Sequence, residues 1–190
     1  MGMGEHRVSD HKPKPERNDA MRTPEPVLRH AHDVFGGIGL DPAGHPDGIY
    51  ATTTVLLPKY VGSTPKVYGW VPQPHWVVFG DGLDISWGGS GLVVANPPWS
   101  DLEPWLTKGS EDGDEVLFIL PARLNAVYFH EQFFDTCGEA LGFPRHRVQY
   151  QGGQKQQNPY HSMFAYYGSR YELFAEFVRR IPGYAVKVRG

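Results

Sequence analysis

The chain has 190 residues, a formal net charge of −3 and 40% hydrophobic residues, which suits one globular domain of ordinary size. The small negative net charge excludes the class of strongly basic proteins that coat nucleic acid. A local basic groove is still compatible with this net charge. The single cysteine, Cys137, excludes an internal disulfide framework and is expected to be a small buried residue. The sequence contains no apolar run of about 18 residues, the length that a membrane span requires. We therefore expect a cytoplasmic protein without a membrane partner.

The N-terminal residues differ in composition from the rest of the chain. Residues 1–20 contain almost no apolar side chains, so we expect a disordered polar tail followed by one domain over residues 21–190. Thr23 and Pro24 form a helix start signal, with the threonine as the cap and the proline at the first helical position. Apolar residues then recur at helical spacing as far as Phe35, which predicts an amphipathic helix.

Short apolar runs alternate with helical patterns along the remaining chain. Strands are expected near residues 38–41, 76–79, 91–96, 115–121, 147–151 and 162–168, and helices over 100–109, 123–142 and 171–181. Ser100 and Glu103 have the spacing of a capping box, and Gly109 is expected to end the helix that they begin. The alternation predicts an α/β fold with a mainly parallel sheet and flanking helices.

A proline-rich segment over residues 54–78 interrupts this alternation, and we interpret it as an insertion near the ligand-binding edge. Its basic and aromatic side chains are Lys59, Tyr60, Lys66, Tyr68 and Trp70. This mixture is compatible with DNA contact, and equally with a surface loop that has its own small cluster. Arg123, Arg145 and Arg147 are further candidates for phosphate contact, or for ordinary surface ion pairs.

Four residues come at the ends of apolar strands: Asp41, Asp81, Asn96 and Pro121. The carboxyl ends of parallel strands meet at one edge of a sheet, and ligands of such folds bind there. We therefore expect the four residues to lie along one rim. Asp84, three residues later, is an alternative to Asp81 as the acidic residue of the site.

The tetrapeptide Asn96-Pro97-Pro98-Trp99 follows an apolar strand directly. Because prolines fix the backbone, the Asn96 amide oxygen and the Pro97 carbonyl can be held as two converging acceptors. Two acceptors suit an exocyclic amino group, and binding both of its hydrogens aims the nitrogen lone pair outward. Trp99 offers a flat face on which a heterocycle can stack. These four residues predict a catalytic corner for an amino-bearing base; a proline-rich strand exit with a core tryptophan is the alternative.

The tetrapeptide is similar to the (Asp/Asn/Ser)-Pro-Pro-(Tyr/Phe/Trp) motif of amino-group methyltransferases. Several stretches between about residues 23 and 168 resemble, in order, the phage-type DNA N6-adenine methyltransferase (Dam) family. These are TPEPVLRHAHDVFGGIGLDPAG, DGLDISW, ANPPWS, LPARLNAVYFHEQFF, RHRVQYQGG and NPYHSMFAYYG. The resemblance implies a class I methyltransferase (Rossmann-like) fold, S-adenosylmethionine as the cofactor, double-stranded DNA as the partner, and no metal.

The resemblance also implies a mechanism, in which a methyl group is transferred directly to N6 of an adenine that is flipped out of the duplex. Asn96 and the Pro97 carbonyl would hold the amino group, and Trp99 would stack on the base. The amine can lose its proton after the attack, so no general base is required. The biological use would be protection from restriction or the marking of replication signals, in the host cytoplasm if the chain is phage-encoded.

The cofactor-binding residues implied by the resemblance are Thr23, Pro24, Asp41, Pro42, Ala43 and Asp81. Thr23 and Pro24 would approach the methionine end, the Asp41 carboxylate would meet the ammonium or ribose, and Asp81 would lie near the adenosine. A competing interpretation takes residues 33–39, DVFGGIG, as a glycine-rich cofactor loop. Such a loop should follow a strand, and the helical pattern before it favours Asp41.

Two features keep alternatives open. The tryptophan that the family usually has before Thr-Pro is absent, and Met-Arg stands there. The corner alone is shared with cytosine-N4, RNA-adenine and protein-glutamine methyltransferases. These activities remain alternatives, as does an inactive relative that only binds nucleic acid.

Overall fold

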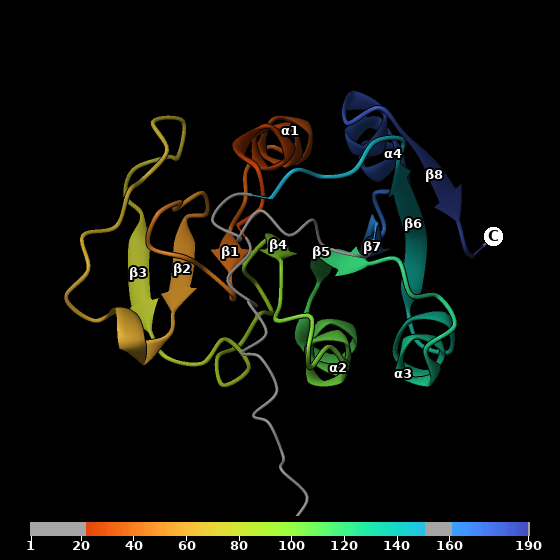
Figure 1. Cartoon of the computed structure of the whole chain (residues 1–190), viewed down its shortest axis with the longest axis horizontal. Helices are drawn as coiled ribbons and strands as arrows, with labels where there is room; N and C mark the ends of the chain where they lie inside the picture. The colour runs from red at the N-terminus through yellow and green to blue at the C-terminus, as the bar shows by residue number, and fades with distance from the viewer. Residues whose placement is uncertain (1–21, 151–160, 190) are drawn as a thin grey trace, which may run out of the picture.

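The computed structural model describes residues 22–150 and 161–189, in which eight strands form one sheet in the order β3-β2-β1-β4-β5-β7-β6-β8 (Figure 1). The strands are β1 (Leu40–Asp41), β2 (Thr53–Leu56), β3 (Trp76–Phe79), β4 (Leu92–Ala95), β5 (Glu115–Pro121), β6 (Gly138–Pro144), β7 (Ser162–Tyr167) and β8 (Gly183–Lys187). Neighbours from β3 to β5 pair in parallel. Strands β7 and β8 run antiparallel to their neighbours. The prediction of a mainly parallel α/β sheet is confirmed.

Helices cover both faces of the sheet. They are α1 (Glu25–Phe35), α2 (Glu103–Asp112), α3 (Val127–Phe129), which a π-helical turn (His130–Phe134) extends, and α4 (Tyr171–Arg180); a 3-10 turn spans Pro58–Tyr60. Figure 1 shows α1 and α4 on one face and α2 and α3 on the other. In the described residues, no helix is both long enough and apolar enough to cross a bilayer.

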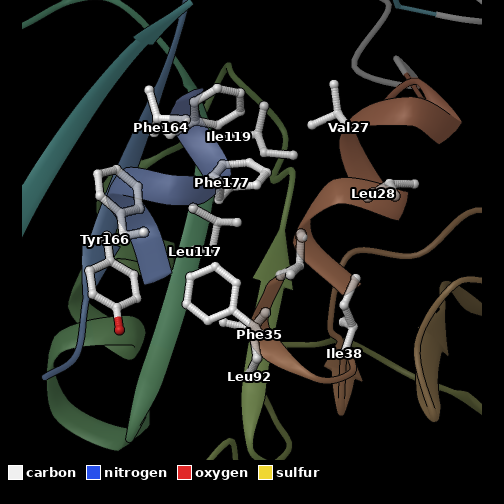
Figure 2. Close-up of a cluster of buried hydrophobic side chains, with 14 of the residues drawn as sticks. Val27, Leu28, Phe35, Ile38, Leu92, Leu117, Ile119, Phe164, Tyr166 and Phe177 are labelled. Carbon is white, nitrogen blue, oxygen red and sulfur yellow. The ribbon is translucent and has the colours of Figure 1, made fainter. Parts of the chain in front are cut away.

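Two hydrophobic clusters fill the layers between the helices and the sheet. On one face, the apolar stripe of α1 meets Leu117 and Ile119 of β5, together with Phe177 of α4 (Figure 2). On the other face, Trp105 of α2 and Phe133 pack against Phe118 and its neighbours. Every side chain of β4 and β5 is buried, as their continuous apolar sequences predict. Each fully buried Val, Leu, Ile or Phe side chain of these strands contributes about 1.5 to 3 kcal/mol.

The segment predicted as an insertion, residues 54–78, supplies most of β2 and part of β3, so only residues 57–75 lie outside the sheet. Part of this loop packs on α1. The Trp70 indole donates a hydrogen bond to Glu25 (3.1 Å), stacks with Tyr68 and meets the ring of His32 edge-on. The loop is therefore attached to the first helix through Trp70.

Several predicted element boundaries are wrong. The helix expected over residues 123–142 ends by Phe134, and residues 138–144 form β6. A Cβ on Gly138 would lie 2.5 Å from the Phe133 carbonyl oxygen, so the strand passes too close to the preceding turn for a side chain. Cys137 lies in the turn between them and is exposed, not buried as expected.

Two further expectations need correction. Residues 147–150 form no strand, and residue 151 lies outside the described residues, as does the expected tail over residues 1–20. Helix α2 begins at Glu103 after Leu102, without a side-chain cap, and continues through Gly109 to Asp112. Gly109 lies inside the helix, where its backbone packs against the Phe118 ring and a Cβ would approach to 2.5 Å, so close packing and not a helix end accounts for this glycine.

Candidate functional site

The carboxyl ends of the parallel strands form one edge of the sheet. Strand β1 ends at Asp41, β4 is followed by Asn96, and β5 ends at Pro121. Asp81 follows β3 after one intervening residue. The turn at Asp81 lies against the loop after Asp41, because a Cβ on Gly82 would be 1.9 Å from the Pro42 carbonyl oxygen. The structure thus places the predicted rim residues along one edge.

Asp41 is a buried carboxylate, only 1% exposed. Its Oδ1 accepts a hydrogen bond from the Ala43 N–H (3.1 Å). Burial raises the pKa of Asp41 to about 7, although the Ala43 N–H and the nearby Tyr50 hydroxyl favour the charged form. A carboxylate in this position is costly for the protein alone, and a cationic or hydroxyl-bearing ligand would offset that cost.

Three buried side-chain oxygens have no hydrogen-bond partner among the described residues: Thr23 Oγ1, Asp41 Oδ2 and Thr54 Oγ1. Such atoms are rare in native structures and often mark a ligand or water site. Thr54 lies beside Asp41, because the two residues are register partners in the parallel β1–β2 pair. Arg22, next to Thr23, donates to the Asp47 carbonyl (3.3 Å), so the chain that enters α1 lies against the loop after Asp41.

The sequence interpretation missed Thr54. A threonine inside a strand is ordinary, because β-branched residues suit the pleated sheet. Its position became informative only when the register set it beside Asp41. The remaining predicted cofactor residues of this loop, Pro42 and Ala43, are buried and half-buried respectively.

Asp81 and Asp84 are both exposed. The Asp81 carboxylate accepts a hydrogen bond from the Leu83 N–H (3.0 Å) and so closes its own turn. An open hollow of about 420 Å³ lies between Leu83 and the side of α2 that carries Thr107 and Glu111.

The competing glycine-rich segment, residues 33–39, lies at the other end of β1. Asp33 is in α1, where it pairs with Arg29, and Gly36 ends that helix in the left-handed conformation (φ 84°). The segment therefore precedes β1 and lies at the edge opposite to Asn96. This position does not fit a loop that follows the strand.

The corner after β4 is a compact turn. Pro97 is buried, and Asn96, Pro98 and Trp99 are half-buried. The Trp99 indole N–H donates to the Asn96 amide oxygen (3.2 Å). An amide oxygen has two lone pairs and can accept two hydrogen bonds in all. The Asp101 N–H donates to the Pro98 carbonyl (3.2 Å) and leads the chain into α2.

No protein-family model matches the chain, and no curated protein matches it. Among solved structures, it is similar to a protein of Pyrococcus horikoshii that is named as a candidate RNA methyltransferase. The TM-score is 0.51, the identity is 17%, and the match covers 74% of this chain and 79% of the other. The chain shares its mainly parallel α/β fold with this protein.

The sheet topology also places the basic candidates at the same edge. Arg145 and Arg147 are exposed in the segment that follows β6, whose carboxyl end lies at this edge, and Arg123 follows the end of β5. Within the described residues, no three His, Cys, Asp or Glu side chains gather as ligands of a metal ion would.

Proposed function

We propose that this chain is an S-adenosylmethionine-dependent DNA methyltransferase that modifies the exocyclic N6 of a flipped adenine. One observation carries the proposal: on a methyltransferase fold, the Asn96–Trp99 corner stands at the same sheet edge as a buried, partly unpartnered Asp41. Such a fold brings a donor and an acceptor together at this edge. Double-stranded DNA is the proposed partner, and Arg145 and Arg147 are the proposed phosphate contacts.

The residues around Asp41 fit the chemistry of the proposed donor. When bound, S-adenosylmethionine supplies a methyl group that a neutral amine can attack. The free Asp41 oxygen would accept hydrogen bonds from its ammonium or ribose hydroxyls. The hydroxyls of Thr23 and Thr54 would gain the partners that the protein does not provide. Pro24, Pro42 and Ala43 would line the site, and Asp81 would lie near the adenosine.

The corner residues would handle the acceptor. The Asn96 oxygen and the Pro97 carbonyl would each accept one hydrogen of the amino group, which leaves its lone pair free to form the new N–C bond. The S–CH3 bond of the donor would break in the same step, its electron pair would return to sulfur, and the neutral thioether S-adenosylhomocysteine would leave. The amine then carries a positive charge and releases one proton to water, so the chain needs no general base. Pro97 and Pro98 hold the acceptors in place before the substrate arrives. Trp99 would stack on the base.

The test incubates the purified full chain with unmethylated double-stranded DNA and isotopically labelled S-adenosylmethionine, followed by mass spectrometry of the nucleosides. Labelled N6-methyladenine supports the proposal. Labelled N4-methylcytosine would keep the amino-group chemistry and overturn the adenine assignment. If neither base is labelled although calorimetry shows donor binding, DNA is not the acceptor. If the donor does not bind either, the chain is an inactive relative.

RNA is the second candidate acceptor, favoured by the name of the Pyrococcus horikoshii protein. An adenine in single-stranded RNA presents the same amino group and needs no extrusion from a duplex. The same assay with unmodified RNA separates the two candidates, because the label then appears in the ribonucleoside and not in the deoxyribonucleoside.

A further inference from the structure

Tyr150 connects the acceptor corner to the sheet. Its ring meets Trp99 edge-on, with centroids 5.6 Å apart and planes at 89°. Its hydroxyl forms a hydrogen bond of 2.8 Å with Ser162 Oγ. Ser162 is buried and is the first residue of β7, where it pairs with Pro121 at the end of β5. A continuous set of contacts therefore runs from the rigid sheet through Tyr150 to Trp99.

The Trp99 contact with Asn96 determines which way the amide faces. An indole nitrogen can only donate, so its 3.2 Å contact selects the amide rotamer whose oxygen lies toward Trp99. A flipped amide would present N–H donors where the oxygen now lies, and N–H donors cannot accept hydrogen bonds from an amino group. The orientation of Trp99 thus controls whether the corner accepts hydrogen bonds from an acceptor base.

We propose that Tyr150 is a positioning residue of the acceptor site, which holds Trp99 so that its indole N–H keeps the Asn96 amide in one orientation. Tyr150 acts through Trp99 and does not touch the reacting atoms. This inference rests on the proposed function. The burial of Tyr150 raises the pKa of its hydroxyl, so it stays a neutral partner of Ser162.

The test uses four variants of the full chain. Tyr150→Ala removes both contacts, Tyr150→Phe keeps the ring and loses the bond to Ser162, and Ser162→Ala removes that bond from the other side. Tyr184→Ala is the matched control, because this tyrosine is 69% exposed on β8. If Tyr150→Ala does not fold, Tyr150→Phe and Ser162→Ala keep the test valid.

Two readouts are compared, of which only the second depends on activity. The first is the fluorine NMR signal of Trp99 in protein labelled with 5-fluorotryptophan, assigned through Trp99→Phe. We expect this signal to shift or broaden in Tyr150→Ala, to change less in Tyr150→Phe and Ser162→Ala, and to stay in place in Tyr184→Ala. An unmoved signal in Tyr150→Ala would overturn the inference.

The second readout is the rate of methyl transfer. We expect Tyr150→Ala to lower kcat by about 10- to 100-fold, since small displacements of positioned groups have effects of this size, while donor affinity stays within about twofold. An unchanged kcat, or a loss that is confined to donor binding, would overturn the positioning role. If the wild-type chain transfers no methyl group, the proposed function fails, and the fluorine signal still decides whether Tyr150 holds Trp99.

Discussion

The acceptor corner and the region around Asp41 lie at one edge of the sheet but differ in how their polar groups are satisfied. In the corner, prolines fix the backbone and Asn96 already accepts a hydrogen bond from Trp99. Buried oxygens of Asp41, of Thr54 beside it and of Thr23 before α1 have no partner among the described residues. The corner is thus arranged in advance, whereas a ligand bound at Asp41, as we propose, would supply hydrogen bonds that the described residues do not provide. This difference predicts that changes in the corner affect the rate, and changes around Asp41 affect affinity and stability.

The largest expected effect separates the two regions through Asn96. We expect Asn96→Ala to lower kcat by about 100- to 1,000-fold, the range seen when one oriented hydrogen-bonding group of an active site is removed. Donor affinity should not change, since the amide would contact the acceptor and not the donor in the proposed mechanism. Nucleoside mass spectrometry gives the rate and calorimetry gives the affinity. Full activity of the variant would disprove the chemistry assigned to the corner.

The next effect is the pH dependence of stability caused by Asp41. The unfolded carboxyl loses its proton near its ordinary value of 3.8, whereas the folded one keeps it to about pH 7. In between, the folded state binds more protons, so the free energy of unfolding of the ligand-free chain falls as the pH rises. The expected decrease from this group is roughly 2 to 3 kcal/mol between pH 5 and pH 8. Urea denaturation at both pH values measures it, and Asp41→Asn should lack this component.

Ionisation of Asp41 should change donor affinity with pH in the direction opposite to its effect on stability. The ionised carboxylate attracts an ammonium group, so donor affinity should increase as the pH rises through about 7. At pH 8, we expect Asp41→Asn to weaken donor binding by about 10- to 100-fold, the loss of one charge-assisted hydrogen bond. Asp135→Asn is the control, because Asp135 is exposed in the turn before β6. Equal affinities of wild type and Asp41→Asn would move the donor site elsewhere.

The smallest expected effect concerns Thr54. Thr54→Val keeps the shape and removes a buried hydroxyl without a partner among the described residues, so the ligand-free chain should gain about 1 kcal/mol of stability. Donor affinity should fall by a few-fold if the hydroxyl contacts the donor. Thr53→Val is the matched control, because its side chain lies on the other face of the same strand. A destabilised Thr54→Val chain would show that the hydroxyl already has a partner.

Some parts of the fold were predictable because their signals are local. The apolar runs of β4 and β5 and the amphipathic pattern of α4 appear directly in the sequence, and the structure has these elements. The 138–144 strand was not predictable, because its apolar residues also match helical spacing and only pairing with β7 and β8 favours the extended form. The edge strand β8 was missed, since a short exposed strand carries little apolar signal.

The sequence by itself determined the local chemistry: two prolines hold an amide and a carbonyl next to a tryptophan, and an aspartate ends the first strand. These features depend on bond geometry within a few residues, so they can be predicted without knowing which distant segments pack against them. The tertiary structure alone decided how those groups behave. It buried Asp41 and raised its pKa, set Thr54 beside it through strand register, and brought Tyr150 against Trp99. Burial, register and contact between distant segments arise only when the whole chain packs, because each depends on residues far apart in sequence.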